Sequence, residues 1–157
     1  MSGRIRHNSQ TRNPLKRLFT LQEYSIANYA SQAHLHAGDS EREHLAVIVE
    51  IAKDQTARAA EIGSLLLARR EFVQRSGFPM HLTGLNYLSA SFVARRILTE
   101  QPALIAAIRE CVDKLHGDHE GEVLARRTLA SEEENLWRLK RILGETSEGA
   151  ATLQMAA

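Results

Sequence analysis

Cysteine, proline and aromatic residues are scarce in this sequence, and each scarcity narrows the class of protein. The single cysteine, Cys111, cannot form a disulfide within the chain, which excludes a disulfide-stabilised scaffold. It fits a reducing compartment, so we expect a cytoplasmic location. Three prolines and 5% aromatic residues, beside abundant Ala, Leu, Glu and Arg, favour helices.

The sequence also has little net charge and no long apolar run. Lys and Arg number 20 against 19 for Asp and Glu, a net charge of +1, so the total predicts no nucleic-acid partner and no membrane surface. No segment has the run of about 18 apolar residues that would span a membrane. The basic start of the chain is not followed by an apolar segment, so we expect no secretory signal.

What is present is the pattern of a single all-α domain. The chain has 157 residues, of which 43% are hydrophobic, enough for a core without metal or disulfide staples. Apolar residues recur at helical spacing in four segments, which we predict as helices at 14–37, 41–72, 85–116 and 119–143. They form a predicted bundle over 13–144, between a mobile N-terminal arm (1–12) and a disordered tail (145–157).

Several helix ends carry local signals. Asn13 and Asp118 are predicted N-caps of the first and fourth helices. Ser40 and Glu43 have the spacing of a capping box at the start of the second helix. Gly38 is expected to end the first helix in the left-handed conformation that favours glycine.

The four helices group into two hairpins joined by a longer connection at 74–84. Extended, that segment reaches roughly 40 Å, so it can cross the bundle from end to end, but its length allows an up-down-up-down arrangement equally. Pro102 lies inside the third predicted helix. It either kinks that helix or splits it, with Thr99 capping the second piece.

Acidic residues on apolar stripes form the main candidate site. Glu23, Glu100 and Glu132 each lie in line with apolar residues at helical spacing, and Asp54 lies on a less apolar line that Glu50 and Glu61 share. The first predicted turn lies at Gly38 and Asp39, and Glu23 and Asp54 are equally far from it. The second lies next to Gly117, and Glu100 and Glu132 are equally far from it. Each pair is therefore level within its hairpin. Four carboxylates at one height inside a bundle require a divalent metal pair or shared protons.

Three segments, LQEYSIANYASQAHLHAG, IVEIAKDQTARAAEIGSLL and LASEEENLWRLKRIL, resemble helices one, two and four of the ferritin-like superfamily, the bacterioferritin and rubrerythrin type of di-iron carboxylate protein. In that family the four helices contribute Glu, Glu-x-x-His, Glu and Glu-x-x-His. The resemblance implies a ferritin-like antiparallel four-helix bundle. It matches the metal ligands to Glu23, Asp54, Glu100 and Glu132.

The sequence departs from this pattern at both histidines. Ala57 follows Asp54 and Asn135 follows Glu132 at the positions where the family has histidine. Alanine cannot bind a metal and asparagine is a weak oxygen donor, so the site would be rich in oxygen and closer to the preference of Mn, Mg or Ca than of iron. The expected cofactor is none or a divalent metal pair, which is Fe as the resemblance implies or Mn as the oxygen ligands favour.

Other residues offer weaker candidates. Five histidines (34, 36, 44, 116 and 119) gather at the two turns, and they meet at one end only if the topology is up-down-up-down. Tyr24 and Tyr29 could contact a metal, although core packing is the favoured role. Cys111 is predicted to be a buried hydrophobe, and Trp137 a partly buried anchor.

Two functions from different classes follow. The favoured one is a ferritin-like bundle without a standard di-iron centre that serves as a structural or interaction module, first of all as a homodimer. The alternative is a carboxylate-ligated dinuclear metal-binding protein with a redox or metal-handling role. A third reading is a regulatory bundle that binds a small ligand or a partner helix between its helices. Whether the protein is an enzyme stays open.

Overall fold

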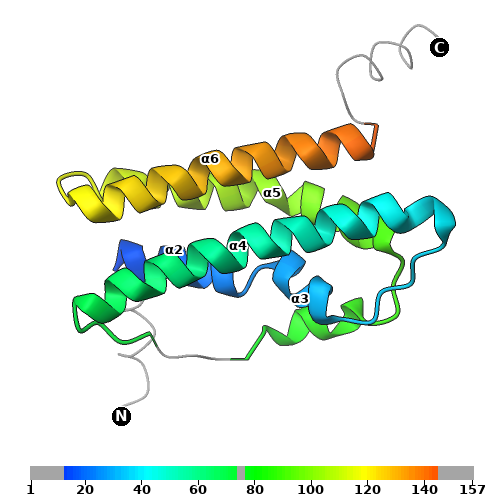
Figure 1. Cartoon of the computed structure of the whole chain (residues 1–157), viewed down its shortest axis with the longest axis horizontal. Helices are drawn as coiled ribbons and strands as arrows, with labels where there is room; N and C mark the ends of the chain where they lie inside the picture. Colours follow the sequence, from blue (N-terminus) through cyan, green and yellow to red (C-terminus); the bar gives the residue numbers. More distant parts are fainter. Residues whose placement is uncertain (1–12, 74–76, 145–157) are drawn as a thin grey trace, which may run out of the picture.

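The computed structural model describes residues 13–73 and 77–144, and these residues are mostly helical with no strand among them. The predicted all-α class is confirmed. The predicted arm (1–12) and tail (145–157) lie outside the described residues. The α-helices are α2 (Pro14–Glu23), α3 (Ile26–Gln32), α4 (Arg42–Ala68), α5 (Ala90–Lys114) and α6 (His119–Ile142), with 3-10 turns η1 (Asp39–Glu41) and η2 (Met80–Leu85) (Figure 1).

The long helices lie side by side, with α5 against α6, and α4 against α2, α3 and α6 (Figure 1). The N-terminal ends of α4 and α5 lie together, because His44 Nδ1 and Ser91 Oγ are 2.6 Å apart. At its other end α4 meets the start of α6, where Arg69 pairs with Asp118. Helices α4 and α5 therefore run parallel, and the connection between them returns along the molecule. Of the two topologies that its length allows, the chain takes the crossover.

The predicted first helix, 14–37, is broken in two at Tyr24 and Ser25. Ser25 adopts an extended conformation and caps α3, its Oγ accepting from the Asn28 N–H at 3.0 Å. The Asn28 side chain donates to the Glu23 carbonyl at 2.7 Å. These side-chain hydrogen bonds compete with the helical ones, which is how Ser and Asn interrupt helices. Because α3 ends at Gln32, Gly38 is not the predicted left-handed helix end, and its φ is −70°.

Two further helix starts differ from prediction. Ser40 lies in η1 and makes no capping hydrogen bond for α4, so the predicted capping box is absent there. Helix α5 begins at Ala90 rather than 85, because η2 precedes it and Ser89 caps it through the Phe92 N–H. Helix α5 is continuous through Pro102, so the proline does not split it.

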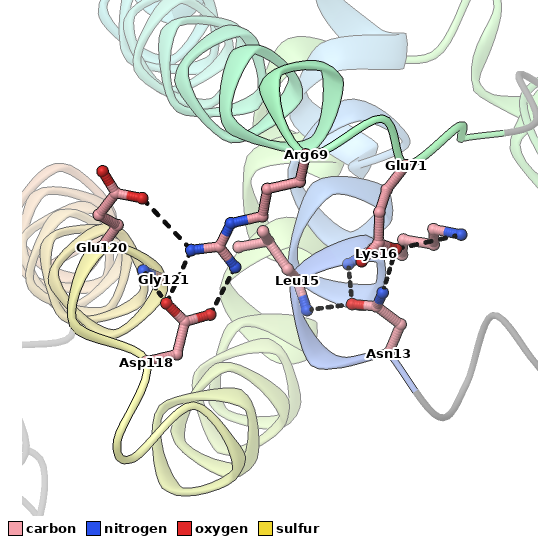
Figure 2. Close-up of polar contacts among 8 residues, drawn as sticks. All are labelled: Asn13, Leu15, Lys16, Arg69, Glu71, Asp118, Glu120 and Gly121. Atoms are coloured by element: carbon pink, nitrogen blue, oxygen red, sulfur yellow. Dashed lines mark hydrogen bonds and ion pairs between the residues drawn. The ribbon is translucent and has the colours of Figure 1, made fainter.

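Figure 2 shows the end of the molecule where α2 begins and α4 ends. Asn13 is the N-cap of α2, as predicted, and accepts from the Leu15 and Lys16 N–H groups at 3.0 and 3.2 Å. Its side-chain N–H₂ donates to Glu71 at 2.6 Å. One side chain thus caps a helix and ties it to the segment after α4.

Asp118, also drawn in Figure 2, both caps a helix and forms an ion pair. It caps α6 as predicted, accepting from the Gly121 N–H at 3.2 Å, and it binds Arg69 with both oxygens at 2.6 and 2.7 Å (Figure 2). The Arg69 hydrogen bonds lower the pKa of Asp118 to about 2 and raise the pKa of Arg69. Glu120 Oε2 lies 3.4 Å from the same guanidinium group.

The apolar core has two halves. The half near the first turn includes Ile48, Ile51, Val93 and Leu139, and the half near the second turn includes Leu18, Ile62, Ile108 and Ala125. No helix in the described part of the chain is both long and apolar enough to cross a membrane.

Cys111 lies in the second-turn half with no exposed surface, as predicted, and burial raises the pKa of its thiol. A raised pKa suppresses the reactive thiolate. Trp137 is 56% exposed and not the partly buried anchor expected; the Arg141 guanidinium lies 5.0 Å from its ring centre.

Candidate functional site

A layer of polar side chains separates the two halves of the core. The layer contains residues from four helices, each at most 2% exposed: Gln22 of α2, Gln55 of α4, Gln101 of α5, and Glu132 and Asn135 of α6. The three glutamines each interrupt a mainly apolar helical stripe. We refer to these five residues as the polar layer.

The Glu132 carboxylate is the centre of the layer. Its Oε1 accepts from Gln22 at 3.1 Å and from Gln55 at 2.8 Å. Its Oε2 accepts from Gln101 at 2.5 Å and from Asn135 at 3.4 Å. Gln101 also donates to the Glu132 backbone carbonyl at 3.0 Å. Both carboxylate oxygens therefore already accept two hydrogen bonds from neutral amides.

These amide donors explain how a carboxylate can occupy the interior. A buried charge without hydrogen bonds is prohibitively costly, whereas several N–H donors aimed at it offset the lost hydration. The carboxylate also fixes each amide, because turning a carbonyl toward it would set oxygen against oxygen. Among the described residues, two buried oxygens of the layer, Gln22 Oε1 and Asn135 Oδ1, have no hydrogen-bond partner.

Of the four acids predicted as metal ligands, the structure places Glu132 in the interior and the other three elsewhere. Asp54 is half-buried and its carboxylate lies 3.2 Å from Arg138. Glu100 is exposed and lies 3.4 Å from Arg96. Glu23 is half-buried beside the break between α2 and α3. The four carboxylates are therefore not gathered at one point.

At three of the four positions, the residue next to the predicted acid is the one buried in the layer. Gln22, Gln55 and Gln101 each adjoin one of the three outlying acids, and one residue turns a helix by about 100°. A signal for the true inward face existed. Gln55 has Ile48, Ile51, Ala59 and Ile62 seven and four residues to either side. Asp54 has Glu50 and Glu61 at two of the corresponding positions. Carboxylates are common metal ligands and glutamines are not, so a metal-site prediction selects the acids.

The other metal candidates are likewise dispersed. Within residues 13–73 and 77–144, no three His, Cys, Asp or Glu side chains form a group able to hold a metal ion. Ala57 is exposed, and Asn135 is buried in the layer. The crossover puts the two turns at opposite ends, which separates their histidines. Tyr24 and Tyr29 pack edge-on against Phe78, with ring centres 5.7 and 5.1 Å away.

A pocket of about 550 Å³ lies beside the layer, between α2, the start of α3, α5 and the connection around η2. Two layer residues, Gln55 and Gln101, line it together with Ser25. The remaining lining is largely apolar, with polar groups at exposed positions such as His81 and Glu100. A mostly apolar cavity of this size with a few polar groups is typical of small-molecule sites.

Comparisons of the chain with protein-family models, with curated proteins and with solved structures found no match. The layer provides one carboxylate held by neutral donors from four helices. The pocket provides an apolar volume that reaches two of those donors.

Proposed function

We propose that the chain is a ferritin-like four-helix bundle in which a hydrogen-bonded polar layer replaces the dinuclear metal centre, and that it serves as an interaction module. The crossover between parallel α4 and α5 supports the ferritin-like arrangement, as do the layer residues contributed by the three long helices α4, α5 and α6 and by the shorter α2. The sequence resemblance supports it independently. The hydrogen bonding of Glu132 is the observation that supports an interaction module without a dinuclear metal centre.

A dinuclear centre requires several anionic ligands to offset two divalent charges. The layer supplies one carboxylate, and both of its oxygens are engaged by amide N–H groups. An amide nitrogen donates hydrogen bonds and cannot bind a cation. Each glutamine side chain would therefore have to rotate its amide group so that the carbonyl oxygen faces the metal. The network is instead suited to fixing the relative register of four helices, since each donor comes from a defined position.

The metal-binding alternative needs a larger rearrangement. Asp54 and Glu100 would have to leave Arg138 and Arg96, and with Glu23 turn from their present faces to the interior. The two unpartnered amide oxygens of Gln22 and Asn135 are the observation in its favour, because carbonyl oxygens are ligands for hard cations. Elemental analysis separates the two functions.

The test compares wild type with Glu132→Gln and with Glu133→Gln as a matched control, since Glu133 is exposed on the same helix and pairs with Arg109. Each protein is incubated with Fe²⁺ under anaerobic conditions or with Mn²⁺, desalted and analysed for metal. We expect no stoichiometric metal in any of the three. Stoichiometric metal in wild type and Glu133→Gln that is absent from Glu132→Gln would establish the alternative.

The homodimer expected from the sequence stays a prediction of this proposal, as does the cytoplasmic location. Large exposed side chains on α5 and α6, among them Phe92 (55% exposed) and Trp137 (56% exposed), are available for such a contact. Light scattering after size exclusion measures the mass directly, and a monomer at all concentrations would contradict the homodimer.

A further inference from the structure

The pocket beside the polar layer has an apolar body and an inner end of hydrogen-bond acceptors. Its apolar lining comes from all the surrounding segments: Leu21, Ile26, Ala27, Pro79, Leu82, Ile97, Ala103, Leu104 and Ala107. On α5, the alanines 103 and 107 leave space that larger side chains would fill. Such a surface favours an apolar ligand body, because its burial releases water from both partners.

The inner end is set by the orientation of the amides. Gln55 and Gln101 point their N–H₂ groups at Glu132, so each carbonyl oxygen lies on the side of the amide away from the carboxylate. For Gln55 this side is the pocket side, because its Oε1 accepts from the Ser25 hydroxyl at 2.5 Å and Ser25 lines the pocket. The inner end therefore offers two oxygen acceptors, Gln55 Oε1 and Ser25 Oγ, the latter also accepting from the Asn28 N–H at 3.0 Å.

The inner end of the pocket lies in front of a buried carboxylate, whereas Glu100 in the lining is 3.4 Å from Arg96. Behind the two amides lies Glu132, whose hydrogen bonds from the described residues all come from uncharged amides. Donating to an anion also polarises each amide and makes its carbonyl a stronger acceptor. The described lining residues include one acid, Glu100, one histidine, His81, and no Lys or Arg. The pocket thus favours a cationic donor over an anion.

We propose that this pocket binds a small primary amine with an apolar body. The ammonium group donates N–H bonds to the Gln55 and Ser25 oxygens, and the apolar body packs between α2 and α5. This inference rests on the proposed function, because it requires Glu132 to remain free of metal. It names a ligand class for the interaction module.

The test uses three probes with the same apolar body: 4-phenylbutylamine, 4-phenylbutan-1-ol and 4-phenylbutanoate. Binding is measured by calorimetry and by amide chemical shifts at low salt, where charge effects are least screened. We expect the amine to bind at least about tenfold more tightly than the alcohol, and the carboxylate not to bind. Equal or tighter binding of the alcohol or the carboxylate, or no binding of any probe, would overturn the proposal.

A matched pair of variants locates the site. Ala107 lines the pocket and is half-buried, whereas Ala106 is exposed on the same helix and does not line it. We expect Ala107→Phe to reduce amine binding at least about tenfold and Ala106→Phe to leave it unchanged. Amine binding that survives Ala107→Phe would place the amine elsewhere and contradict the proposal.

A third variant tests the charge behind the amides. Glu132→Gln removes that charge, so we expect the preference for the amine over the alcohol to fall toward unity, while an unchanged preference would contradict the role of Glu132. If this variant does not fold, the three probes and the alanine pair still decide the proposal. Failure of the amine-binding proposal is distinguishable from failure of the proposed function. Stoichiometric metal at Glu132 overturns both, and a metal-free protein that binds no amine overturns this inference alone.

Discussion

Glu132 and Asp118 are both carboxylates of α6, each accepts several hydrogen bonds, and they stabilise the protein in different ways. Glu132 has no exposed surface, and its donors are neutral amides contributed by four helices. The Asp118 side chain is 32% exposed, and its main donor is the charged Arg69. The buried group depends on hydrogen-bond geometry supplied by the whole fold. The surface group depends on a local cap and an ion pair that solvent screens.

This comparison predicts effects of different size and different sensitivity to pH. Removal of the buried carboxylate leaves its donors without acceptors in a dry interior. Removal of the surface carboxylate leaves Arg69 and the first turn of α6 accessible to water.

The largest effect is expected from Glu132→Ala. Four amide donors lose their acceptor inside the protein, so the free energy of unfolding should fall by about 3–5 kcal/mol. Chemical denaturation measures it. Glu133→Ala, on the exposed side of the same helix, serves as the control and should change stability by less than about 1 kcal/mol. A loss in Glu132→Ala as small as that of the control would show that the layer does not hold the helices together.

The contribution of Asp118 should depend on pH. Its pKa is held at about 2, below the usual 3.8, mainly by the hydrogen bonds from Arg69. A carboxyl whose pKa is lower in the folded state stabilises the fold above its unfolded pKa, and this contribution is lost as pH falls toward 2. Because the pair is about one-third exposed, we expect about 1 kcal/mol rather than the full value of the shift.

The measurement is the free energy of unfolding of wild type and Asp118→Asn between pH 7 and pH 2. Asparagine keeps the helix cap and removes the charge, so it isolates the ion pair. The difference between the two proteins should be constant above about pH 5 and shrink below pH 4. A difference that persists to pH 2 would contradict the assignment.

The smallest effect is expected at Gly121, where the cap closes tightly. A Cβ at this position would lie 2.8 Å from Asp118 Oδ2 and 3.0 Å from Leu115 Cδ2. Alanine is a better helix former than glycine by about 1 kcal/mol, but this contact opposes it, so Gly121→Ala should change stability by less than about 0.5 kcal/mol. In an Asp118→Ala background, where the carboxylate is gone, the same change should be more stabilising. Identical effects in the two backgrounds would show that the contact with Asp118 is unimportant.

How far the sequence predicted the site is clearest from the polar layer. Glu132 was identified because it lies on an apolar stripe at the height expected from the second turn. The same reasoning chose Glu23, Asp54 and Glu100 where the structure buries Gln22, Gln55 and Gln101. The ferritin-like resemblance implies acids at these positions, and it remains a proposal. A search for uncharged polar residues with apolar neighbours on both sides would have selected Gln55 and Gln101.

The sequence by itself determined the features whose cause is local: the all-α class, the caps at Asn13 and Asp118, and the burial of Cys111 on its apolar stripe. A cap is decided by atoms within three residues of the helix end, so it can be recognised from a short segment. The tertiary structure decided the crossover, which of two adjacent polar residues faces inward, and the long-range hydrogen bond that adds to the local ones at the Ser25 break. Ser25 bonds to Gln55 on another helix, and the glutamines bond to Glu132 on a third. Their conformations depend on partners distant in the chain, and only the packed fold brings those partners within reach.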